Sequence, residues 1–269
     1  RVLVTDPGYP CHRHVAGVMG GEAVKVPLDK RHQLSEEVVT NFWDDRSRAL
    51  ILASPSNPTG ALTSDKTLAA ITDFVRSRDG ALISDEIYHG LTYGRDAPSA
   101  LVFSDQVFVI NSFSKYWGMT GWRLGWLIGP PSFAAELERL AQNLFLASST
   151  IAQHAALAAF LPETLAIVED RRKEFHSRRD LMLPALADTG FEIDARPEGA
   201  FYIYARCTRF SPDSAVFCDE LLEKAGVALT PGIDFGSHRA HEHLRFAYTA
   251  NSARLMEAIQ RIGNFVRSL

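Results

Sequence analysis

The stretch Asn111–Trp126 reads NSFSKYWGMTGWRLGW. It begins where the apolar, β-branched run at residues 107–110 (VFVI) ends, and so short a run predicts a strand buried on both faces. Two hydroxyl side chains, Ser112 and Ser114, come just before Lys115. The stretch therefore places a lysine and two hydroxyls at the exit of a predicted buried strand.

These side chains suggest a specific chemistry. A lysine at the end of a buried strand is partly desolvated, which favours the neutral amine and makes it a nucleophile toward carbonyls. The hydroxyls and Arg123, eight residues after the lysine, are donors that suit an anionic phosphate. An amine nucleophile beside a phosphate site indicates a lysine that forms a Schiff base with pyridoxal phosphate (PLP).

Strand and helix patterns alternate ahead of this stretch. Ala49–Ala53 and Ala81–Ser84 have the composition of buried strands, and Ser35 and either Thr63 or Ser64 are placed to cap helices. This alternation predicts an α/β fold with a mostly parallel sheet.

Polar residues follow successive predicted strands. Asn57 comes after the first of them, Asp85 after the second and Lys115 after the third. Since ligands bind outside the carboxyl ends of parallel strands, we expect these side chains to meet at one edge of the sheet.

Asp85 begins the segment DEIYHGLTYG and is a candidate partner for a protonated pyridine nitrogen, which it would keep electron-withdrawing. Tyr88 and Asn57 could both donate to the phenolic oxygen of the cofactor. The alternatives are a helix N-cap or a surface acid for Asp85, and an ordinary turn for Asn57-Pro58.

S-x-S-K, followed eight residues after the lysine by Arg within G-x-R-x-G, resembles the fold-type I PLP enzymes. More narrowly, it resembles the class I/II aminotransferases, the aspartate aminotransferase-like enzymes. The resemblance implies a large domain with a mostly parallel central sheet and a smaller α+β C-terminal domain. The residues that match cofactor positions of the family are Asn57, Asp85, Tyr88, Ser112, Ser114, Lys115 and Arg123.

Two further residues match the family. Tyr9 falls where its members carry the aromatic that stacks on the pyridine ring, although aromatics in Pro-Gly turns are common. Arg245, in HLRFAYTA, resembles the arginine that binds the substrate α-carboxylate; the alternative is a buried structural ion pair. The resemblance implies catalytic roles for Lys115, Asp85 and Tyr88, and gives Asn57 a place in substrate binding beside Arg245.

The composition changes after the charged helical pattern EDRRKEFHSRRD at residues 169–180. Residues 191–193 and 200–205 are predicted antiparallel strands. We therefore place a domain boundary near Arg171, between a large PLP-binding domain at 1–170 and a small C-terminal domain at 171–269.

Members of the family also have a segment that precedes the part matched by Arg1. It supplies backbone amides that bind the phosphate at a helix N-terminus, and an arm that closes the site. We expect this N-terminal part of the family fold to be absent from residues 1–170.

Composition excludes other classes of protein. Lys and Arg number 28 against 32 Asp and Glu, a net charge of −4 without a basic block, which gives no case for nucleic acid. No apolar run reaches the length of a membrane span. The three cysteines, Cys11, Cys207 and Cys218, are widely spaced and predict reduced thiols of a cytoplasmic protein.

Two other motifs are weaker. Ser112-x-x-Lys115 also fits the β-lactamase acyl-enzyme motif, but no Lys-Thr-Gly partner appears in the chain. His238, His241 and His243 lack H-E-x-x-H order, which favours a solvated loop and no metal site.

The sequence thus predicts a homodimeric, PLP-dependent aminotransferase that moves an amino group between an α-amino acid and a 2-keto acid. Two alternatives remain open. One is a PLP-dependent carbon–sulfur β-lyase of the same fold. The other is the aminotransferase-like sensor domain of a transcription regulator, which is not an enzyme.

Overall fold

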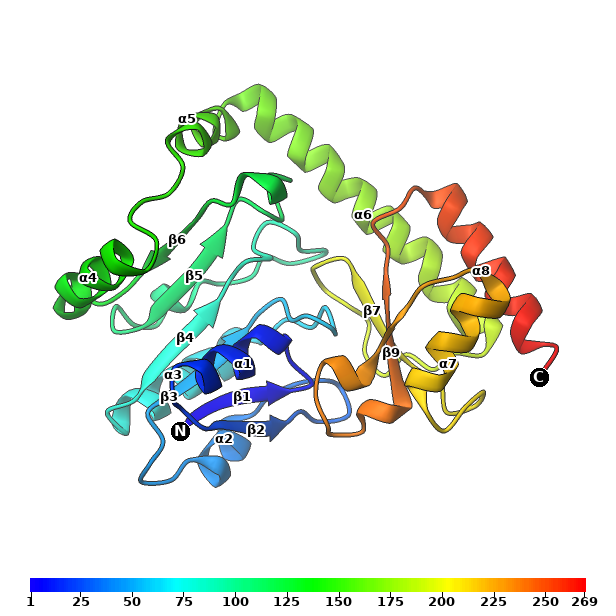
Figure 1. Ribbon diagram of the computed structural model, residues 1–269, viewed down its shortest axis with the longest axis horizontal. Coiled ribbons are helices and arrows are strands. Elements are labelled where there is room, and N and C mark those ends of the chain that lie inside the picture. Colours follow the sequence, from blue (N-terminus) through cyan, green and yellow to red (C-terminus); the bar gives the residue numbers. More distant parts are fainter.

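A six-stranded sheet and a three-stranded sheet organise the structure, a computed structural model that describes residues 1–269 (Figure 1). The strand order of the larger sheet is β2-β1-β3-β4-β5-β6, parallel except for β6, which runs antiparallel to β5. The smaller sheet has the antiparallel order β7-β9-β8. The strands are Val2–Asp6 (β1), Ala23–Pro27 (β2), Ala49–Ala53 (β3), Ala81–Asp85 (β4), Phe108–Ser112 (β5), Gly125–Ile128 (β6), Tyr202–Arg206 (β7), Thr230–Pro231 (β8) and His243–Ala247 (β9).

The α-helices alternate with the strands in the first half of the chain, which confirms the predicted α/β fold. Ser35 and Ser64 accept hydrogen bonds from Val38 N and Thr67 N and cap α2 and α3, as predicted. The α-helices are Pro10–Val18 (α1), Glu36–Phe42 (α2), Asp65–Ser77 (α3), Ala134–Leu144 (α4), Thr150–Ala159 (α5), Pro162–Thr189 (α6), Ser214–Glu220 (α7) and Ser252–Val266 (α8).

The larger sheet packs against α2 and α3. Leu50 and Leu82 from its central strands are buried in the same apolar cluster as Val39 of α2 and Ile71 and Val75 of α3. Burial of these side chains, at about 1.5–3 kcal/mol each, fixes the helices on the sheet. The carboxyl ends of β3, β4 and β5 therefore meet at one edge.

The smaller sheet has an apolar cluster of its own. Ile203 and Leu244 of β7 and β9 pack with Leu186 of α6, Phe217 of α7 and Ile259 of α8. The 28-residue α6 runs from beside α5 toward this sheet (Figure 1). Because α6 passes through Arg171 without a break, the domain boundary near that residue stays a prediction.

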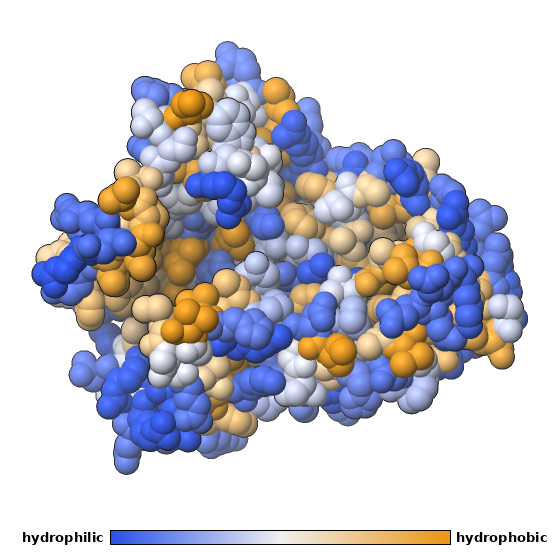
Figure 2. Space-filling model, in the orientation of Figure 1, coloured by the Kyte–Doolittle hydropathy of each residue, from blue (hydrophilic) through white to orange (hydrophobic).

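The prediction that residues 107–110 form a strand buried on both faces is wrong for one face. The side chain of Ile110 is 39% exposed, and its partner Leu127 on β6 is 47% exposed. Figure 2 shows apolar residues gathered in a hollow over the β5–β6 side of the molecule. Val107 and Val109 are buried on the opposite face, against the helices.

The strand predicted at residues 191–193 is also absent. Only Glu192 pairs, through a single bridge to Arg206 at the edge of β7 that does not face β9. The short strand Thr230–Pro231 was not predicted, since a two-residue strand that includes proline carries no periodic pattern.

No single helix is long and apolar enough to cross a membrane; α5 and α6 reach that length and composition only together, with an 80° bend between them. The three cysteines form no disulfide, and two of them, Cys207 and Cys218, are buried.

Candidate active site

One cavity of about 520 Å³ contains all nine site residues predicted from the sequence. It opens at the carboxyl ends of β3, β4 and β5, and Arg245 reaches it from β9 of the smaller sheet. The residues that line it are Tyr9, Ala53, Asn57, Asp85, Ile87, Tyr88, Ser112, Ser114, Lys115, Thr120, Arg123, Leu124, Gly125, Tyr202 and Arg245.

Lys115 lies in the turn that follows β5, and its ammonium is half-buried among aromatic side chains. The Nζ atom lies 5.7 Å from the ring centre of Tyr88 and 5.8 Å from that of Phe201. Burial lowers the pKa of Lys115, and the guanidinium groups of Arg245 and Arg123 lower it further, against an opposing effect of Asp85. The site therefore favours the neutral, nucleophilic amine.

We expect Lys115 to react with an amine-directed acylating reagent at lower pH than Lys66, which is exposed on α3. Both burial and the nearby guanidinium groups favour the unprotonated form, so its titration midpoint lies below the ordinary lysine value. Competitive labelling followed by mass spectrometry measures both midpoints in one sample. Arg245→Ala raises the Lys115 midpoint and leaves that of Lys66 unchanged; equal midpoints for the two lysines contradict the prediction.

Asp85 stands at the end of β4 and is held by two partners. Its Oδ1 accepts a hydrogen bond from Ile87 N at 3.1 Å, and its Oδ2 lies 2.9 Å from His12 Nε2. His12 was not predicted as a site residue, although it follows Tyr9 by three positions and the two rings are in edge contact at 5.6 Å. That spacing at the start of a helix was the only signal that could have identified it.

Tyr88 and Tyr202 both line the cavity and are hydrogen-bonded to each other, with their hydroxyl oxygens 2.9 Å apart. Both rings are almost fully buried, and burial raises the pKa of each phenol. They remain protonated donors at neutral pH. Sequence reasoning missed Tyr202, because a tyrosine on a strand of aromatic and apolar residues is indistinguishable from core.

The hydroxyl and guanidinium groups next to Lys115 form a cluster of donors. Ser112 Oγ lies 2.8 Å from Ser114 Oγ and 3.0 Å from the carbonyl of Leu124. Arg123, in the left-handed region at φ +52°, donates from Nη1 to Thr120 O at 2.9 Å. These contacts orient the three side chains, and Arg123 uses one of its five N–H donors in them.

Arg245 joins the two sheets at the cavity. Its Nη1 donates to Asn57 Oδ1 at 2.9 Å and its Nη2 to Thr230 Oγ1 at 3.2 Å, and the guanidinium carbon lies 4.3 Å from the ring centre of Tyr202. Arg245 forms no ion pair with a carboxylate, and its hydrogen-bond partners are neutral side chains. The structure therefore does not support the alternative of a structural ion pair. Its Nε is buried without a hydrogen-bond partner, an arrangement that suits an anionic ligand.

The prediction of a solvated loop for the three histidines is wrong for one of them. His238 and His241 are exposed, but His243 begins β9 and is 3% exposed. Three closely spaced histidines gave no indication of which one a strand would bury.

The residues present fit a PLP-sized anionic cofactor. Ser112, Ser114 and Arg123 line the cavity together with Lys115 and the carboxylate of Asp85. The unpartnered Nε of Arg245 provides a second place for negative charge. The donor cluster thus suits a phosphate, the amine of Lys115 suits a reactive carbonyl, and the carboxylate of Asp85 suits a basic ring nitrogen.

Comparison with known proteins places the chain in a family. Residues 1–262 match the family described as aminotransferase class I and II. The valine–pyruvate aminotransferase of Mycobacterium tuberculosis is 38% identical over 100% of this chain and 70% of its own length. The (5-formylfuran-3-yl)methyl phosphate transaminase of Methanocaldococcus jannaschii is 35% identical, over 98% of this chain and 68% of its own length.

Solved structures give the same result for the fold. A crystal structure of an aminotransferase from Mycobacterium tuberculosis superposes with a TM-score of 0.95 at 38% identity, covering 100% of this chain and 70% of that one. The predicted family, fold and enzymatic activity are confirmed: this chain belongs to the class I and II aminotransferases.

Proposed function

We propose that this aminotransferase carries out transamination with PLP bound in the 520 Å³ cavity, and that Lys115 is its catalytic lysine. One observation carries the proposal. Nine residues selected from the sequence, by their chemistry or by resemblance to the family, line a single cavity, and the lysine among them has a lowered pKa. Such a shift in a cleft is typical of a catalytic group.

The residues of the cavity divide by the part of PLP that each would bind. Ser112, Ser114 and Arg123 would hold the phosphate, and Tyr9 would cover one face of the ring. Asp85 would accept the proton of the pyridine nitrogen, with His12 orienting its carboxylate. When bound, PLP supplies an electron-withdrawing ring that takes up the electrons released at the substrate Cα.

The remaining steps are the work of the side chains. Lys115 Nζ is the base that removes the proton from the substrate Cα, since its lowered pKa leaves a fraction of the amine unprotonated. The phenol of Tyr88 stays protonated and would donate to the phenolic oxygen of bound PLP. Because Asn57 Oδ1 already accepts from Arg245, its amide nitrogen is the group that can donate to the same oxygen.

The substrates in this proposal are an α-amino acid and a 2-keto acid, both of which carry a carboxylate for Arg245. The two relatives are named for different substrates, so neither fixes the side chain that this enzyme accepts. Asn57 and Thr230 orient the guanidinium fork of Arg245 toward the cavity.

Arg245→Ala is expected to weaken binding of the substrate carboxylate by roughly 2–5 kcal/mol, chiefly as a higher KM. The reason is that a half-buried, fork-shaped donor pair is lost. Steady-state kinetics with several amino acids measure the effect, and Arg254→Ala, at an exposed arginine of α8, is the matched control. An unchanged kcat/KM would show that Arg245 is structural.

Borohydride reduction tests the cofactor assignment. Protein loaded with PLP is reduced, digested and mapped by mass spectrometry, and we expect the pyridoxyl label on Lys115. A label on any other lysine contradicts the proposal. A screen of amino donors and keto acids then separates transamination from the two alternative functions. Release of a thiol without a keto-acid acceptor indicates a β-lyase. Retention of PLP with neither activity indicates a sensor domain.

We also propose that the enzyme is a cytoplasmic homodimer. Exposed apolar side chains on β6 and α4, among them Leu127, Ile128, Leu140 and Leu144, support a surface that a second copy covers. Sedimentation of the PLP-loaded protein measures the oligomeric state.

A further inference from the structure

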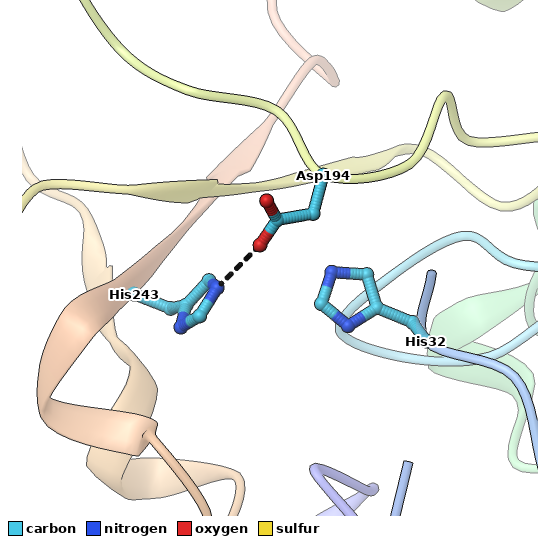
Figure 3. Close-up of side chains that lie close together, drawn as sticks. All are labelled: His32, Asp194 and His243. Carbon is cyan, nitrogen blue, oxygen red and sulfur yellow. Dashed lines mark hydrogen bonds and ion pairs between the residues drawn. The ribbon is translucent and has the colours of Figure 1, made fainter. Parts of the chain in front are cut away.

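A second group of titratable side chains lies away from the active-site cavity, where the two sheets come together. His32 follows β2, Asp194 lies between α6 and β7, and His243 is the first residue of β9. Figure 3 shows the three side chains pointing toward one another. One ligand atom from each lies within 4.8 Å of the other two.

Both ring nitrogens of His243 face hydrogen-bond acceptors. His243 Nδ1 lies 3.0 Å from the carbonyl oxygen of Arg239, and its Nε2 lies 3.2 Å from Asp194 Oδ2. Both neighbours accept hydrogen bonds, whereas a neutral imidazole has a single N–H. Either an extra proton or a cation must therefore sit between His243 and Asp194.

His32 decides between these two possibilities. Its side chain is 8% exposed, and its Nε2 is buried without a hydrogen-bond partner. A proton on His243 satisfies only Asp194 and leaves this third polar atom unpaired. A metal ion accepts lone pairs from all three groups at once.

We propose that His32, Asp194 and His243 bind a divalent transition-metal ion, with Zn²⁺ as the expected species. Two imidazoles and one carboxylate favour Zn²⁺, Co²⁺ or Ni²⁺ over Mg²⁺ and Ca²⁺, which prefer all-oxygen sites. Three protein ligands leave a fourth position for water, and a cavity of about 390 Å³ lined by His32 and His243 provides the space.

The geometry is close to that of a metal site. Tetrahedral ligands with bonds of about 2.0–2.2 Å lie roughly 3.3–3.6 Å from one another. The pair from His243 and Asp194 is already at 3.2 Å. His32 needs to approach by at most roughly 1.5 Å, since no ligand pair exceeds 4.8 Å.

Surrounding groups hold the ligands as outer-shell partners of metals do. The Arg239 carbonyl takes the Nδ1 proton of His243, which leaves Nε2 as the ligand atom. Arg206 binds the second carboxylate oxygen of Asp194 at 2.8 Å, and the ring of Tyr204 stacks on His243 at 4.7 Å.

The ion would connect the two sheets next to the active site. His32 belongs to the loop after β2 of the larger sheet, and His243 to β9 of the smaller one. Arg245 is two residues further along β9, on the same face of the strand. A bound ion would therefore also fix the strand that presents Arg245 to Asn57.

The first test locates the ion by X-ray diffraction at the zinc absorption edge, on crystals of the PLP-loaded protein soaked in Zn²⁺. We expect one anomalous peak within about 2.0–2.2 Å of His32, His243 and Asp194. The absence of a peak there, with crystals that diffract, overturns the proposal.

The second test measures zinc affinity in solution by equilibrium dialysis of the PLP-loaded protein after treatment with a chelator. His32→Asn is the decisive variant, because asparagine tolerates the φ of +58° at this position and the lost nitrogen has no hydrogen bond. We expect it to bind Zn²⁺ at least about 100-fold more weakly, beyond the 10–100-fold typical of an outer-shell loss.

Two controls accompany this variant. His238→Asn changes an exposed histidine of the same cavity, and Cys11→Ser removes the exposed thiol; both should keep the affinity of the unaltered protein. Zinc should also raise the melting temperature of the unaltered protein and not that of His32→Asn. Equal affinity and equal melting shifts in His32→Asn place the bound zinc elsewhere and overturn the proposal.

Discussion

Replacing Lys115 by alanine is expected to lower kcat for transamination by at least about 10⁴-fold. The upper end of the range for a single positioned acid–base group is already about 10⁴, and this amine also acts as the nucleophile toward the cofactor carbonyl. No other lysine lines the cavity, so none can take over. Stopped-flow absorbance after mixing with an amino acid measures the step at the substrate Cα directly.

The control for this variant is Lys66→Ala, at an exposed lysine of α3. Small primary amines should restore part of the activity of Lys115→Ala in proportion to their basicity, because the missing group is a base in an open cavity. Turnover of Lys115→Ala within tenfold of the unaltered enzyme would remove Lys115 from the mechanism.

Asp85→Ala is expected to leave the fold intact and to lower kcat by roughly two to four powers of ten. Loss of one partner from a buried charge pair costs about 3–5 kcal/mol. The pair in question is the one that the Asp85 carboxylate would form with the protonated ring nitrogen of PLP. The carboxylate is fixed for this role by His12 and by the backbone of Ile87. Kinetics must be measured on protein whose PLP content has been determined, so that weaker binding is not read as slower chemistry.

Two further variants separate charge from structure at this position. Asp85→Glu should recover part of the activity, since the charge is kept, whereas Asp85→Asn should not. His12→Gln should have a smaller effect than Asp85→Ala, because His12 only orients the carboxylate. Near-normal kcat in the PLP-loaded Asp85→Asn enzyme would contradict the assignment.

Much of this protein could be predicted from short segments of sequence. Ala49–Ala53 is a strand with the predicted bounds, and the strand predicted at Ala81–Ser84 runs one residue further, to Asp85. Both follow from local periodicity, which is a property of neighbouring residues. The candidate residues at the exits of β3, β4 and β5 could be predicted for a related reason, since parallel strands bring their carboxyl ends to one edge.

Only the tertiary structure brought the remaining groups together. The contacts of His12 with Asp85, Tyr88 with Tyr202 and Arg245 with Asn57 join residues 73, 114 and 188 positions apart. These contacts depend on how α1 and the smaller sheet pack against the larger sheet. A local sequence pattern carries no information about packing between segments so far apart in the chain.

The His32, Asp194 and His243 group illustrates the same limit. The sequence showed three histidines within six positions and favoured a solvated loop. In the structure His243 is the first residue of β9 and is buried. It lies close to His32 and Asp194, which come from two other segments of the chain. Local sequence determined which elements form and which residues end them; packing between the two sheets determined which side chains share a site, because burial and approach depend on surfaces contributed by distant segments.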